Sequence, residues 1–459
     1  MQQSVITRTI TVAPGRFAPG HLGELTQQVP FELVDAVLAQ TGRVQSRIRD
    51  LPARVVVYLL LAGCLFAELG YGQVWRRLCA GLDGLPLAAP TASALTQARR
   101  RLGSAPLRAL FDLLCGPAPV AATSGVRVGG LLVCAIDGTT LSVADTPANL
   151  GAYAKQPGHH GGSGYPLLRL VALVACGTRS LINVVYGPTS SGETTMCDRL
   201  LGSLHAGMLV LCDRNLTTNT LTRRIAATDA HLLGRCKADR KLPVLRRLQD
   251  GSYLSVMGGV TVRVIAAEIT VATSAGRATG VYRLATTLTD ARSWPAAALV
   301  ALYHQRWEIE TAYLELKSSI LGGRVLRART PQGIDQEVYA LLVCYQLLRL
   351  AMADATSTQP EVDPDRASFT IALHTARDQL IQATGVIAAA TIDPVGTIGR
   401  HVLGNLLPDR RLRVAPRIVK RAISKYQARG PNINHTSYKA TLSIDILDQS
   451  TPLTTGPGP

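Results

Sequence analysis

Four residues with chemically active side chains lie within one short stretch of the chain. They are Tyr303, Arg306, Glu310 and Lys317, in the sequence YHQRWEIETAYLELK at residues 303–317. If this stretch is one α-helix, a step of about 100° per residue places all four within an arc of about 60°. Apolar residues flank the arc, so a carboxylate, two cations and a phenol replace the Leu or Val of an ordinary core helix. Because such groups are costly to bury, the pattern indicates a functional site.

Other residues of this stretch have simpler interpretations. Six of them form a mainly polar face opposite the arc: His304, Gln305, Glu308, Ala312, Glu315 and Ser319. Arg306 lies four residues before Glu310, so a surface ion pair between them is the alternative to a functional role. Trp307 and Trp294 could stack on an unpaired base, although core packing is the favoured interpretation of both.

Two further acids each end an apolar run that is typical of a buried strand. Asp137 ends LLVCAID at 131–137, and Asp213 ends GMLVLCD at 207–213. Ligand sites of open α/β sheets collect at the carboxyl ends of strands. With Glu310, the two aspartates would supply hard oxygen ligands for two Mg²⁺ or Mn²⁺ ions, which suit phosphoryl transfer. Taken singly, Asp137 is better explained as a turn residue and Asp213 as a helix N-cap, but taken with the residues at 303–317 the metal interpretation is favoured.

The spacing Y-x2-R-x3-E-x6-K resembles the signature of the IS4-type transposases of bacterial insertion sequences. GYPLLRLVALVACGTRSLINVVYGP and GMLVLCDRN are similar to the catalytic core of that family, and FELVDAVLAQTG to its N-terminal domain. The resemblance implies an RNase H-like sheet with a β-rich insertion, and a catalytic triad of Asp137, Asp213 and Glu310. Asn215 stands where the family pattern has Gly.

The same resemblance implies DNA contacts by Tyr303, Arg306 and Lys317. An arginine can bind a phosphate bidentately, and a lysine binds it as a point charge. The phenol of Tyr303 could donate a hydrogen bond to a phosphate.

Composition supports a polyanionic partner. The formal net charge is +17 over 459 residues, and 47% of the residues are hydrophobic, enough for well-packed cores. Simple solubility or a basic proteome is the alternative source of this charge. Nine cysteines form no CxxC pair, which indicates reduced thiols in the cytoplasm and no zinc site. We expect a nucleoid-associated protein outside the membrane, since the apolar run at 55–67 is too short to span a bilayer.

Pattern changes along the chain predict five regions. The predicted fold is α/β: an RNase H-like core with an all-β insertion, an α-helical N-terminal domain and a helical basic C-terminal region. The predicted boundaries are an irregular arm at 1–30, a helical DNA end-binding domain at 31–125, a catalytic domain at 126–330, a helical basic region at 331–450 and a disordered tail at 451–459. The β insertion is expected at about 230–290.

Two basic regions are candidates for DNA contact. Arg99, Arg100 and Arg101 lie in a predicted helix of the end-binding domain. Eight Lys or Arg residues without an acid lie at 410–429, including Lys420 and Arg421. A solvated charge run is the common explanation of such clusters, but a polyanionic substrate favours DNA contact.

The sequence therefore predicts a DNA transposase that cleaves the ends of an insertion sequence and joins them to target DNA. Its partners would be double-stranded DNA, from the ends and the target, and a second copy of the chain in a homodimeric synaptic complex. Two alternatives remain open: an RNase H-like nuclease without strand transfer, and a DNA-binding derivative that has lost catalysis. Inverted repeats flanking the gene would favour the transposase.

Overall fold

The structure is a computed structural model, and it describes residues 9–12, 16–45, 49–118, 126–156, 164–274, 276–383, 395–408, 413–414 and 438–447. Within these residues the chain divides into two compact units. Unit 1 comprises residues up to 203 together with 307–406. Unit 2 comprises residues 204–306 together with those from 407 onward. The predicted catalytic domain at 126–330 is therefore shared between the two units.

Unit 1 begins with a strand pair and a group of helices. Its N-terminal elements are β1 (Thr9–Val12), β2 (Arg16–Pro19), the 3₁₀ turn η1 (Leu25–Gln27), α1 (Phe31–Gln40), α2 (Ala53–Leu65), α3 (Tyr71–Cys79), α4 (Ala92–Leu102) and α5 (Ala105–Leu114). The helical expectation for this region agrees with α1–α5. The expectation of an irregular arm is wrong, because β1 and β2 pair antiparallel and Ala18, Leu22 and Leu25 are buried.

Four antiparallel strands follow in the same unit. Its elements are β3 (Arg127–Val128), β4 (Leu131–Ser142), α6 (Pro147–Leu150), β5 (Leu167–Ala175), β6 (Leu181–Pro188), α7 (Glu193–Asp198) and η2 (Leu201–Ser203). β4 pairs with β5 and β5 with β6, while the short β3 pairs with β4. β4 and β5 are largely buried, as their continuous apolar sequences predict.

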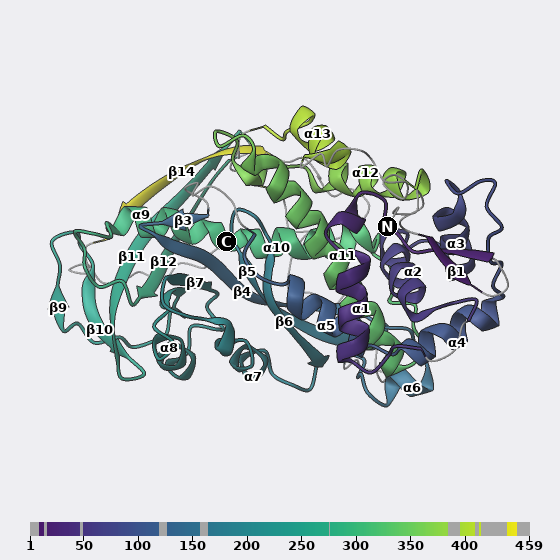
Figure 1. The fold of residues 1–459 in the computed structure, drawn as a ribbon. Helices are drawn as coiled ribbons and strands as arrows, with labels where there is room; N and C mark the ends of the chain where they lie inside the picture. The colour runs from purple at the N-terminus through teal and green to yellow at the C-terminus, as the bar shows by residue number, and fades with distance from the viewer. Residues whose placement is uncertain are drawn as a thin grey trace. The chain divides into compact units, whose positions relative to one another are not determined.

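Helices from the second half of the chain complete unit 1. They are α10 (Trp307–Leu314), the π-helical segment η4 (Glu315–Ile320), α11 (Pro331–Ser357), η5 (Pro364–Arg366), α12 (Phe369–Ile381) and α13 (Gly396–Gly404). The long helix α11 packs against α2, α5, α12 and α13 (Figure 1). By length and composition α11 could cross a membrane, with a hydropathy of 1.4, but 78% of its most apolar window is buried inside the protein.

Unit 2 is built mainly from strands. Its elements are β7 (Met208–Cys212), α8 (Asn219–Ala226), β8 (His231–Arg235), β9 (Arg246–Arg247), β10 (Tyr253–Met257), β11 (Val260–Thr273), β12 (Gly276–Thr286), α9 (Ala296–Tyr303), η3 (His304–Arg306), β13 (Arg413–Val414) and β14 (Tyr438–Ile446). β7 and β8 are parallel, and the other pairs are antiparallel. The all-β insertion expected at about 230–290 corresponds to β8–β12.

The predicted helical C-terminal region is only partly helical. α11, α12 and α13 agree with it, but residues 438–446 form β14, which pairs with β11 over seven residue pairs. The alternating sequence YKATLSIDI suits a strand with one face packed and one face solvated. Lys420, Arg421, most of the basic run at 410–429 and the tail at 451–459 lie outside the described residues.

The packing of helix α5 against the rest of unit 1 can be tested directly. Leu110 is completely buried, whereas Leu113 on the same helix is 58% exposed. We expect Leu110→Ala to lower the free energy of unfolding by about 2–5 kcal/mol, because it leaves a cavity in the core. Leu113→Ala should change it by less than about 0.5 kcal/mol. Urea denaturation of both variants measures this difference, and equal effects would contradict the packing described here.

Candidate active site

Asp137 lies in the middle of a strand and not at its end. β4 continues to Ser142, so the prediction that the strand stops at Asp137 is wrong. Asp137 pairs opposite Ala172 of β5, and its Oδ1 accepts a hydrogen bond of 2.8 Å from the amide of Gly138. Its half-buried side chain is thus carried by a rigid strand.

Tyr313 joins the helix of Glu310 to the strand of Asp137. Its hydroxyl donates to the Asp137 carbonyl at 2.6 Å and accepts from the Ala172 amide at 3.2 Å. Burial raises the pKa of Tyr313 well above its usual value, and the nearby Asp137 carboxylate raises it further. The phenol therefore stays protonated at neutral pH and can donate this bond. Two peptide groups of adjacent strands consequently fix the position of α10.

Lys317 reaches the same strand. Its Nζ lies 3.2 Å from Oγ1 of Thr139, two residues beyond Asp137 on β4. Residues 303–317 do not form the single regular α-helix that the spacing analysis assumed. α9 ends at Tyr303, a 3₁₀ turn follows, α10 begins at Trp307, and Lys317 lies in a π-helical turn.

Asp213 lies in unit 2 at the end of β7, as predicted. Its Oδ1 accepts hydrogen bonds of 2.9 Å from the amides of Asn215 and Leu216, which organise a turn before α8. Tyr303 donates to the carbonyl of the preceding residue, Cys212, at 2.9 Å. Burial raises the pKa of Tyr303, so its hydroxyl keeps its hydrogen. In this structure that hydrogen goes to the backbone beside Asp213 and not to the phosphate predicted as its acceptor.

A buried arginine fixes the start of α9, the helix that carries Tyr303. Arg263 on β11 is completely buried and contacts Asp250, Ser252 and the Trp294 carbonyl. Oδ2 of Asp250 accepts from the amide of Ala296, the first residue of α9, at 3.2 Å. Burial opposes ionisation of Asp250, but Ser252 and Arg263 outweigh it and lower its pKa. The carboxylate is therefore charged where it caps the helix.

The predicted site residues divide between the two units. Asp137, Glu310 and Lys317 belong to unit 1, and Asp213, Tyr303 and Arg306 belong to unit 2. Within unit 1, the contacts of Tyr313 and Lys317 hold the helix of Glu310 on the strand of Asp137. Among the described residues, no group of three or more His, Cys, Asp or Glu side chains could hold a metal ion.

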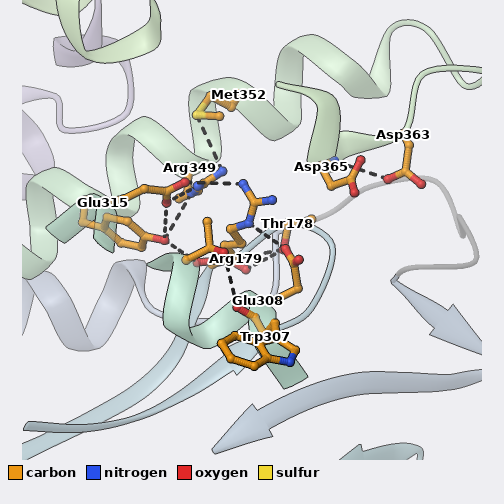
Figure 2. A network of polar contacts seen from close by, with 12 residues as sticks. Thr178, Arg179, Trp307, Glu308, Glu315, Arg349, Met352, Asp363 and Asp365 are labelled. Atoms are coloured by element: carbon orange, nitrogen blue, oxygen red, sulfur yellow. Dashed lines mark hydrogen bonds and ion pairs between the residues drawn. The ribbon is translucent and has the colours of Figure 1, made fainter. Parts of the chain in front are cut away.

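Sequence reasoning missed two acids on the same helical stretch. Glu308 and Glu315 were expected on a polar outer face, but they are 0% and 6% exposed and pair with Arg179 and Arg349 (Figure 2). No local pattern reveals these partners, because Arg179 lies 129 residues before Glu308 in the chain.

A third acid, Glu193 of α7, lies against the strand beside Asp137. A Cβ at Gly138 would stand 2.1 Å from Oε1 of Glu193, so glycine leaves room for this carboxylate. No role was expected for Glu193 from the sequence, since only the fold brings α7 to β4.

The basic helix α4 presents its three arginines differently. Arg99 stacks on Tyr71, with 3.8 Å from its guanidinium carbon to the ring centroid, and is half-buried. Arg100 and Arg101 are exposed. Arg101 lines a shallow pocket of about 220 Å³ with Arg43 and Arg49. Desolvation and then the charge of Arg49 lower the pKa of Arg101, as expected where like charges converge.

The two tryptophans do not share one environment. Trp307 is 45% exposed, so the favoured interpretation of core packing is wrong for this residue. Trp294 is half-buried, and its carbonyl accepts from Arg263.

Two family models match the chain. Residues 19–112 match the model described as insertion element 4 transposase N-terminal, and residues 129–347 match the model described as transposase DDE domain. The chain is therefore a DDE transposase, an enzyme of DNA cleavage and joining. It belongs to the IS4-type family, and the predicted fold class, α/β with an RNase H-like core, is confirmed.

Two curated proteins and one solved structure are similar to the chain. The chain is 28% identical over 411 residues to the transposase InsG for insertion sequence element IS4 of Escherichia coli, covering 86% of this chain and 91% of that protein. It is 27% identical over 190 residues to the putative transposase InsZ of the same organism, covering 41% of this chain and 62% of that protein. A cryo-EM structure of the piggyBac transposase synaptic complex with hairpin DNA is similar at a TM-score of 0.42, with 12% identity over 84% of each chain.

The link between Tyr313 and Asp137 can be tested by removing one oxygen. Tyr313→Phe leaves a buried carbonyl and a buried amide without this partner, which should cost about 1–3 kcal/mol of unfolding free energy. Cleavage should fall as well, because α10 loses its polar attachment to β4. Tyr165→Phe is the control, since Tyr165 is 50% exposed. Wild-type stability and cleavage in Tyr313→Phe would show that the bond has no role.

Proposed function

We propose that the DNA cleavage and joining of this transposase are carried out by Asp137, Asp213 and Glu310. One observation carries the proposal: the helix of Glu310 is bonded to the strand of Asp137 through Tyr313. Of the three acids on 307–317, Glu308 and Glu315 are buried in ion pairs. Glu310 is half-buried, so its carboxylate is more accessible than those of the other two acids. Glu310 is therefore the acid of this helix best suited to the reaction.

The chemistry of the donor set fits hard divalent cations, although the described side chains do not converge as a metal-binding group in this structure. Three carboxylates and no thiol or imidazole match the preference of Mg²⁺ and Mn²⁺ for oxygen ligands. We propose that Asp137, Asp213 and Glu310 hold two such ions. When bound, the ions would activate the attacking oxygen and neutralise the leaving one. The protein's own part is to hold the carboxylates: β4 carries Asp137, and the turn amides orient Asp213.

Three residues near these acids have proposed roles toward DNA. Lys317, on Thr139, would hold a phosphate as a point charge, and Arg306 would hold one bidentately. Tyr303 would act through the backbone, since its hydroxyl bonds Cys212 next to Asp213.

The remaining assignments concern partners and location. Residues 31–125 would bind the DNA ends through Arg99, Arg100 and Arg101, and Lys420 and Arg421 would contact the DNA backbone. The pocket of Arg43, Arg49 and Arg101 supports a polyanion contact in the first of these regions. We further propose a homodimer in the synaptic complex and a cytoplasmic, nucleoid-associated location. No observation favours a nuclease without strand transfer.

The triad can be tested one acid at a time. Asp137→Ala, Asp213→Ala and Glu310→Ala should each lower cleavage of DNA ends by on the order of a thousandfold or more, since each removes a group that acts in the transition state. Affinity for the ends, measured by gel shift, should stay close to that of the wild type. The exposed Asp239→Ala is the matched control and should cleave normally. Normal cleavage by Glu310→Ala would refute the assignment.

The electrostatic part of DNA binding can be tested with salt. If binding neutralises about six phosphates, affinity should fall roughly a thousandfold between 50 and 200 mM salt. Arg101→Gln should weaken binding to all sequences alike and reduce the magnitude of the salt slope by about one. Arg77→Gln on α3 is a control of the same charge change outside the pocket. A wild-type slope in Arg101→Gln would remove this arginine from the DNA contact.

A further inference from the structure

Glu308 and Glu315 lie on the helix that carries Glu310 and belong to a buried network of charged side chains. Arg179 donates from Nε to Glu308 at 2.6 Å and from a terminal nitrogen to Glu315 at 3.4 Å. Arg349 binds the other oxygen of Glu315. All four side chains are at least nine-tenths buried, and two arginines balance two glutamates. Figure 2 shows Arg179 reaching both glutamates from a neighbouring turn.

Three separate elements meet in this network. Arg179 comes from the turn between β5 and β6, the glutamates from α10 and η4, and Arg349 from α11. Tyr345 of α11 closes it: its hydroxyl lies 3.0 Å from the Arg179 carbonyl and 3.1 Å from Glu315. Arg179 has a φ of 55°, a left-handed conformation that a non-glycine residue keeps only where its surroundings fix it. The contacts of Arg179 thus help to hold this turn in its left-handed conformation.

The network contacts the helix at the point where its backbone changes from α-helical to π-helical geometry. Glu315 is the first residue of the π-helical segment, and Lys317 is the third. A π-helical turn is wider than an α-helical one, so residues beyond Glu315 point in directions that depend on where this turn begins. Anchoring Glu315 fixes that point, and the Lys317 ammonium then lies 3.2 Å from Thr139 on the opposite, sheet side.

We propose that Arg179 is a positioning residue for DNA cleavage: through Glu308 and Glu315 it sets the rotation of the 307–320 helix, and so where Glu310 and Lys317 stand over β4. This inference rests on the proposed function, because it takes Glu310 as a metal ligand and Lys317 as a phosphate contact. Arg179 itself touches neither the substrate nor a metal ion. Its effect on the reaction passes entirely through the helix.

The test removes the contacts of Arg179 with the two glutamates without leaving a buried charge unpaired. The double variant Arg179→Met with Glu308→Gln keeps the side chains near their volumes and removes one positive and one negative charge, so that Glu315 keeps Arg349 as its partner. It should fold and bind DNA ends as the wild type does. Its nicking rate should fall about tenfold or more, and the Mg²⁺ concentration for half-maximal nicking should rise about tenfold, as when the support of a metal ligand is loosened. Arg179→Lys keeps the charge but lacks the planar guanidinium fork that spans the two carboxylates, so it should show smaller changes of both kinds.

A matched control separates positioning from stability. Arg327 and Glu337 form another Arg–Glu pair in unit 1, and the other hydrogen bonds described for Arg327 go to the carbonyls of Gly63 and Leu69. The double variant Arg327→Met with Glu337→Gln should lower the melting temperature but leave the half-maximal Mg²⁺ concentration unchanged. If the Arg179 variants lose only melting temperature, with wild-type metal dependence, the proposal is overturned. Should the double variant not fold, Arg179→Lys alone decides by the same two readouts.

Glu310→Gln in the same assay distinguishes failure of the proposed site from failure of the positioning role of Arg179. If this variant nicks at the wild-type rate, the proposed site fails and the positioning role falls with it. If Glu310→Gln is inactive while the Arg179 variants nick with normal rate and metal dependence, only the positioning role fails.

Discussion

Directional polar contacts hold the 307–320 helix on both of its sides, and the placement of Glu310 depends on them. Toward the sheet, the Tyr313 hydroxyl lies between the Asp137 carbonyl and the Ala172 amide. On the other side, Glu308 and Glu315 pair with buried arginines. Hydrophobic contact alone is non-directional and tolerates small rotations of a helix. Hydrogen bonds weaken steeply with angle, so contacts of this kind on both sides select one setting of the helix.

The parts of the fold that the sequence predicted are those with a strong local pattern. The apolar runs of β4, β5 and β7 and the long apolar helices α2 and α11 are recognisable because burial alone dictates their composition. β14 was missed because its partner, β11, lies far upstream, and strand pairing depends on that distant edge. β1 was missed for a different reason: its sequence TITV is β-branched, but the Gly and Pro residues of this region were taken as the sign of an irregular arm. The division into two units was also missed, since neither unit is continuous in sequence.

The candidate site was found by residue type and spacing, and it was misjudged where the backbone departs from ideal geometry. A regular helix was assumed across residues 303–317, but the chain passes through 3₁₀, α and π turns. The hydroxyl of Tyr303 was expected to bind a phosphate, and in this structure it bonds the Cys212 carbonyl, a partner that only the packing of α9 provides. Spacing thus nominates candidate residues but does not predict what each one contacts.

The three acids of this helix show why burial alone does not identify a reactive group. Glu308 and Glu315 are more deeply buried than Glu310, and an argument from desolvation cost would choose them first. Their charges are balanced by Arg179 and Arg349, so their oxygens are already committed to guanidinium groups. An acid held in this way would have to break a buried ion pair before it could bind a metal ion, a costly step. Glu310 is the more accessible of the three, and in the proposed arrangement the two buried acids support it by fixing the helix on which it stands.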